Sequence, residues 1–125
     1  MNQPARTSGS LGYREQEYAA APMLGVQKFP LGLQRAIKVE AAASGRTITE
    51  VLADELEAVA TRLERDPSAK APERQSRGDL ISLWTVKHFP ASLRERLKAL
   101  ARVEGIDLYL FLIRELYGAF GDGDA

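Results

Sequence analysis

The apolar positions of this chain fall into two blocks that share one spacing. In residues 26–56, and again in residues 86–116, a short alternating run precedes two stretches where apolar residues recur every three or four positions. Alternation with a period of two is typical of a strand buried on one face, and the longer period is typical of an amphipathic helix. The pattern therefore predicts two strand–helix–helix units in one chain.

The two blocks align without a gap when Val26 is matched to Val86. The identical pairs are Val26/Val86, Phe29/Phe89, Pro30/Pro90, Leu33/Leu93, Lys38/Lys98, Ala41/Ala101, Gly45/Gly105, Leu52/Leu112, Glu55/Glu115 and Leu56/Leu116. Two copies are too few for a solenoid, which needs at least three stacked repeats. The repeat instead indicates two similar halves that pack on each other about a pseudo-two-fold axis.

Each copy is predicted to hold a strand and two helices. We expect strands over residues 24–29 and 83–89, first helices over 31–44 and 91–104, and second helices over 48–63 and 108–120. A proline follows each strand, where it suits the first turn of a helix, and a glycine follows each first helix as a C-cap. Thr47 with Glu50 forms a capping-box pattern, and Asp107 is placed to cap the last helix.

Each copy contains only one strand, and a solitary strand is unstable because its backbone groups are unpaired. Antiparallel pairing of strand 24–29 with strand 83–89 would satisfy both, and the helices could close beneath the resulting ribbon. The predicted fold is therefore mainly α with a short two-stranded antiparallel β-ribbon, an intramolecular pseudo-dimer with four helices. Pairing between two chains is an alternative that the sequence leaves open.

The segments outside the two copies are polar and irregular. The predicted organisation is a flexible N-terminal arm over 1–22, copy 1 over 23–63, a linker over 64–80, copy 2 over 81–120 and an acidic tail over 121–125. Two prolines and alternating charges mark residues 64–80 as a linker.

Composition excludes several classes of protein. The chain has 17 basic and 17 acidic side chains, one histidine and no cysteine. We therefore expect no disulfide, no metal site and no cofactor. Phosphate-binding, dinucleotide and nucleophile-elbow motifs are missing, so neither an enzyme nor a small-molecule substrate is expected. No apolar run reaches the ~20 residues of a membrane span and no signal peptide is apparent, which favours a cytoplasmic protein.

Three local motifs point to one family. These are the V-x-x-F-P strand ends, the L-x-x-x-[IL]-K-x-x-A first helices and the G-R-T-I-T-E turn of the first copy. With them, residues 24–63 and 83–120 resemble the ribbon-helix-helix (Arc/MetJ-like) family of DNA-binding repressors and antitoxins. Members of that family are usually homodimers of one unit, so the tandem repeat resembles a fused dimer.

The resemblance implies a sequence-specific regulator of repressor, antitoxin or plasmid-maintenance type, whose ribbon enters the major groove of double-stranded DNA. Alternation along the strands places Leu24, Val26, Trp84 and Val86 toward the helices. The opposite face would then offer three side chains to the bases. These are Gln27, Thr85 and Lys87.

Phosphate contacts are expected at two kinds of position. Lys28 and His88 end the strands, and Arg46, Thr47 and Thr49 surround the start of a helix, whose N–H groups and dipole favour an anion. In the second copy Asp107 puts a carboxylate where a phosphate would dock, so this anchor is expected in the first copy only.

Helix 108–120 is apolar nearly all round, which indicates burial on more than one side. Leu108, Phe111, Leu112 and Leu116 can serve the shared core. Four further side chains then need another cover, from self-association or a protein partner. They are Tyr109, Leu110, Ile113 and Tyr117. This surface and the zero net charge support an alternative function, a protein-interaction or assembly module with the same fold that has lost groove readout.

Overall fold

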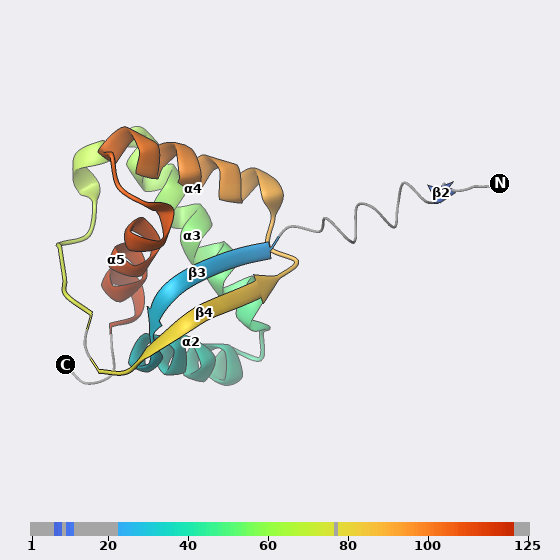
Figure 1. The fold of residues 1–125 in the computed structure, drawn as a ribbon, viewed down its shortest axis with the longest axis horizontal. Helices are drawn as coiled ribbons and strands as arrows, with labels where there is room; N and C mark the ends of the chain where they lie inside the picture. The colour runs from blue at the N-terminus through green and yellow to red at the C-terminus, as the bar shows by residue number, and fades with distance from the viewer. Residues whose placement is uncertain (1–6, 9, 12–22, 77, 122–125) are drawn as a thin grey trace.

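The computed structural model describes residues 7–8, 10–11, 23–76 and 78–121, and places four helices against a two-stranded ribbon in that part of the chain (Figure 1). The elements are β1 (Thr7–Ser8), β2 (Ser10–Leu11), β3 (Met23–Pro30), α2 (Leu31–Ser44), α3 (Ile48–Arg65), η1 (Pro67–Ala69), β4 (Leu80–Lys87), α4 (Ala91–Glu104) and α5 (Leu108–Phe120). The predicted acidic tail, apart from Gly121, and the predicted arm, apart from β1 and β2, lie outside the described residues.

The ribbon joins the two copies within one chain. Strands β3 and β4 are antiparallel, with Leu24 opposite Val86, Val26 opposite Trp84 and Gly25 opposite Thr85. Exchanging each residue for its equivalent in the other copy swaps the first two of these pairs and leaves the third unchanged. A pseudo-two-fold axis therefore passes between Gly25 and Thr85. The predicted intramolecular pairing and fold class are confirmed.

A residue with left-handed backbone lies near the end of β3 and another directly follows β4. Lys28 has a φ of 51° and His88, its equivalent in copy 2, has a φ of 62°. This conformation is unfavourable for residues other than glycine. It breaks the alternation and turns Phe29 and Phe89, the next residues in each copy, fully into the core. Strand β4 also begins earlier than predicted, at Leu80.

Both first helices have the predicted bounds, and each ends at a glycine in the left-handed conformation, Gly45 or Gly105. The capping box of α3 is also present: the Thr47 hydroxyl accepts from the Glu50 N–H at 3.0 Å, and the Thr47 N–H donates to Glu50 Oε1 at 2.8 Å. Asp107 occupies the N-cap position of α5, but its side chain accepts no capping hydrogen bond. That part of the prediction is wrong.

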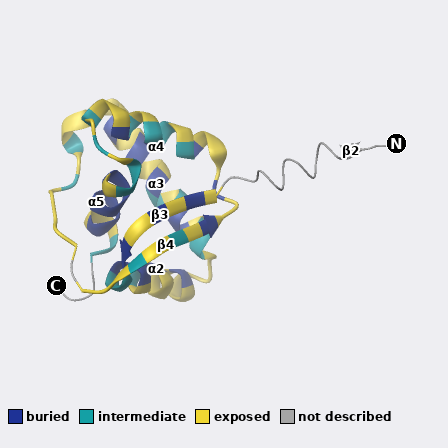
Figure 2. Cartoon of the chain, viewed as in Figure 1, coloured by how far each residue is buried: buried dark blue, intermediate teal, exposed yellow. Residues whose placement is uncertain are grey.

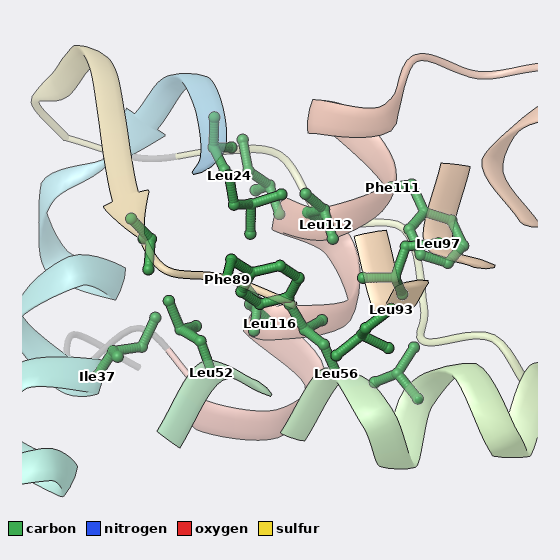
Figure 3. Close-up of a cluster of buried hydrophobic side chains, with 14 of the residues drawn as sticks. Leu24, Ile37, Leu52, Leu56, Phe89, Leu93, Leu97, Phe111, Leu112 and Leu116 are labelled. Atoms are coloured by element: carbon green, nitrogen blue, oxygen red, sulfur yellow. The ribbon is translucent and has the colours of Figure 1, made fainter. Parts of the chain in front are cut away.

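The core lies between the inner face of the ribbon and the helices (Figure 2). In Figure 3, Phe89 lies among Leu24 of β3 and Leu112 and Leu116 of α5. Trp84, on the same face of the ribbon, packs on Phe29 with ring centroids 4.6 Å apart. The two copies therefore share one interior, as expected of units this small. No helix in the described part of the chain is long and apolar enough to cross a membrane.

Helix α5 is the most enclosed helix, with every residue from Phe111 to Tyr117 buried. Ile113 and Tyr117 belong to this stretch, so the prediction that they need cover from another chain is wrong. The linker supplies part of that cover: the Arg74 guanidinium lies over the Tyr117 ring at 4.8 Å. A Cβ at Gly118 would come within 2.9 Å of the Ala71 Cβ, so glycine permits this close approach.

A buried ionic network fixes the linker to α5. The fully buried carboxylate of Glu115 accepts from Arg62 Nη2 at 2.7 Å, from Arg114 Nε at 2.9 Å and from the Ala71 N–H at 2.9 Å. Arg114 also binds both oxygens of Glu104, at 2.7 and 2.9 Å. These bonds lower the pKa of Glu104, and they raise the pKa of Arg114 despite its burial. The network thus connects α3, the linker, α4 and α5.

Candidate nucleic-acid interface

The outer face of the ribbon carries all three predicted base-contacting residues. Gln27, Thr85 and Lys87 are exposed, and they alternate with the buried or half-buried side chains of the inner face. Figure 2 shows this alternation along both strands. In the register, Gln27 lies opposite Leu83, and Lys87 lies opposite Met23. The three side chains are therefore spread along the ribbon on both sides of its centre.

Two apolar residues share this face. Met23 is 48% exposed and Leu83 is 56% exposed, and the alignment of the two copies makes them equivalent. The same alignment makes Gln27 and Lys87 equivalent, so polar side chains occupy one diagonal and apolar side chains the other. The Leu83 side chain reaches across Gly25, coming within 3.4 Å of where a Cβ would stand.

Met23 and Leu83 were not among the predicted site residues, although the alternation that found Gln27 and Lys87 also contains them. Leu83 lies two positions before Thr85, and Met23 lies two before Gly25 on the same outward-facing row. Their apolar character favours interpretation as core, although the alternation and the observed register both place them on the outer face. Apolar side chains on a groove-facing ribbon can contact thymine methyl groups, so their exposure is compatible with DNA as well as with a protein partner.

The start of α3 lies beside one end of the ribbon. The Thr49 hydroxyl donates to the backbone carbonyl of Lys87 at 2.9 Å, which joins copy 1 to copy 2. This contact brings the predicted phosphate residues Thr47 and Thr49 close to Lys87, and His88 follows directly. Lys28 is at the other end of the paired region, shortly before the exit of β3 at Pro30.

Two groups at the start of α3 already have partners inside the chain. Arg46 forms an ion pair with Asp54, and its Nε lies 3.3 Å from the Ser44 hydroxyl. The Thr47 N–H donates a hydrogen bond to the Glu50 carboxylate. An exposed ion pair contributes only about 0–1 kcal/mol, so Arg46 can exchange Asp54 for a phosphate at small cost.

The start of α5 differs in charge from the start of α3. In the aligned copies, Arg46 is replaced by Ile106, Thr47 by Asp107 and Thr49 by Tyr109. The cation and hydroxyls of the first copy thus give way to a carboxylate and apolar groups. Of the predicted partner surface on α5, Tyr109 is half-buried and Leu110 is 47% exposed, so of the four predicted residues only these two reach the surface.

Comparison of the chain with protein-family models, with curated proteins and with solved structures finds no match. The resemblance to the ribbon-helix-helix family therefore stays a prediction from the sequence motifs. The architecture, with its paired strands and shared core, stands independently of that resemblance.

Proposed function

We propose that the protein is a sequence-specific regulator that inserts the β3–β4 ribbon into the major groove of double-stranded DNA. The observation that carries this proposal is the outward placement of Gln27, Thr85 and Lys87, with the start of α3 beside Lys87. The major groove, about 12 Å wide, admits a two-stranded ribbon. Gln suits adenine N6 and N7, and Lys suits guanine O6 and N7.

Phosphate contacts would fix the ribbon in the groove. The N-terminus of α3 offers backbone N–H groups and the positive end of a helix dipole, with Thr47, Thr49 and Arg46 around it. Lys28, near the end of β3, and His88, directly after β4, lie toward opposite ends of the ribbon. Since the net charge of the chain is zero, binding depends on these local groups and not on overall attraction. The repressor, antitoxin or plasmid-maintenance role is supported by the family resemblance alone.

Titration of fluorescently labelled duplexes, followed by anisotropy across a salt series, tests this function. We expect affinity to fall steeply with salt, because phosphate contacts release counterions. Replacing Gln27 and Lys87 together with alanine should weaken the free energy of binding to the preferred site by about 1–3 kcal/mol per base contact. The variant should also discriminate less between DNA sequences. A Gln75→Ala/Lys38→Ala variant is the matched control, because both residues are exposed but lie off the ribbon. Lack of salt-dependent affinity for any duplex at low ionic strength would remove the proposal.

A protein-interaction module is the second candidate, favoured by the exposed Met23 and Leu83. In that case the apolar diagonal, and not the polar one, would carry the binding energy. Glutamate at Met23 and Leu83 would abolish partner binding, whereas the Gln27/Lys87 alanine pair would leave it unchanged.

A further inference from the structure

We infer that the ribbon reads a site whose two halves present different bases at equal distances from the centre, guanine to Lys87 and adenine to Gln27. This inference rests on the proposed function and adds the chemistry of the target. It gives the protein a single preferred direction on DNA.

The register supplies the geometry. Gly25 and Thr85 lie opposite each other on the pseudo-two-fold axis, with the Met23–Lys87 pair on one side and the Gln27–Leu83 pair on the other. Lys87 follows Leu83 by four positions, which is roughly 14 Å along an extended strand. At about 3.4 Å per base pair, the two base-contacting residues, Gln27 and Lys87 (the two readers), lie about four base pairs apart. They therefore occupy equivalent positions in the two halves of a pseudo-palindrome.

The chemistry of the two readers differs although their positions match. The Lys ammonium is a donor only and fits the two acceptors of guanine, O6 and N7. The Gln amide has both a donor and an acceptor and fits adenine N6 and N7. A homodimer carries one residue type at both positions and prefers equal halves. This chain carries two types, so unequal halves satisfy both side chains.

The residues expected to contact DNA phosphates differ between the two halves in the same sense. The Thr49 hydroxyl bonds the Lys87 carbonyl, so the start of α3, with its two threonine hydroxyls and Arg46, belongs to the guanine half. The equivalent helix start in the other copy carries Asp107, which repels a phosphate. Contacts to bases and to backbone thus both distinguish the two halves, and they favour the same orientation.

Exchange of the readers tests the inference. Selection from a randomised duplex pool first gives the preferred site, and three duplexes are then made with guanine/adenine, guanine/guanine or adenine/adenine at the two positions. Wild-type protein should prefer the mixed site by about tenfold over either symmetric site. Gln27→Lys should shift the preference to guanine/guanine, and Lys87→Gln should shift it to adenine/adenine.

Two control variants distinguish the recognition of bases from a general change in the charge of the protein. Gln75→Lys and Lys38→Gln make the same charge changes at exposed positions off the ribbon and should leave the preference as in wild type. Binding with a symmetric preference, or a Gln27→Lys variant that keeps the wild-type preference, overturns the inference while the DNA-binding function stands. Enrichment of no duplex at low salt overturns both.

Discussion

Replacing Glu115 with alanine is expected to lower the free energy of unfolding by about 3–5 kcal/mol. The carboxylate is fully buried and accepts from Arg62, from Arg114 and from the Ala71 N–H. Its removal leaves the nearly buried Arg114 with one carboxylate fewer and leaves the Ala71 N–H without its bond. Urea denaturation followed by circular dichroism measures the loss.

Glu55 is the matched control, because it is the same residue at the equivalent position of copy 1. It is only half-buried, and burial raises its pKa, with Arg62 acting in the opposite direction. A raised carboxyl pKa means that the folded state disfavours the charge, so Glu55→Ala should cost less than about 1 kcal/mol. Equal losses in the two variants would contradict the account of the linker network.

Replacing Phe89 with alanine is also expected to cost about 3–5 kcal/mol. The ring is fully buried between the ribbon and α5, and its removal leaves a cavity at the centre of the shared core (Figure 3). Since both copies line this core, the variant should still unfold in one transition, with its midpoint shifted to lower urea.

Phe120→Ala supplies the comparison for Phe89, because its ring at the end of α5 is only half-buried. It should cost clearly less, since a half-buried ring leaves a smaller cavity. Two separate transitions in Phe89→Ala, one of them unchanged from wild type, would show that the copies fold independently and would contradict a shared core.

Local patterns accounted for most of the elements. The proline and glycine signals give the bounds of α2 and α4, and alternation places Gln27, Thr85 and Lys87 outward. The inward turn of Phe29 and Phe89 is expected from their apolar character, but its cause is not visible in the sequence. It depends on left-handed backbone at Lys28 and His88, where no glycine marks the position.

Contacts between distant residues could not be predicted. The helix of residues 108–120 has too many apolar residues for one buried face, so its sequence predicts an external partner for Ile113 and Tyr117. Periodicity considers one helix in isolation and does not show that other parts of the same chain cover it. The prolines and charges of the linker predict a spacer, yet Ala71 and Arg74 pack against α5. A bond such as Arg62 to Glu115 joins residues with no shared local pattern, so only the folded arrangement reveals it.

An engineered disulfide tests the central claim, that copy 1 and copy 2 of one chain pair through β3 and β4. The chain has no cysteine, so cysteines at Gly25 and Thr85, which lie opposite each other on the pseudo-two-fold axis, can be cross-linked without competition. At low protein concentration, oxidation should give a monomer whose mass spectrum shows the 25–85 bond within one chain. Cross-linked dimers, or free thiols throughout, would contradict the account.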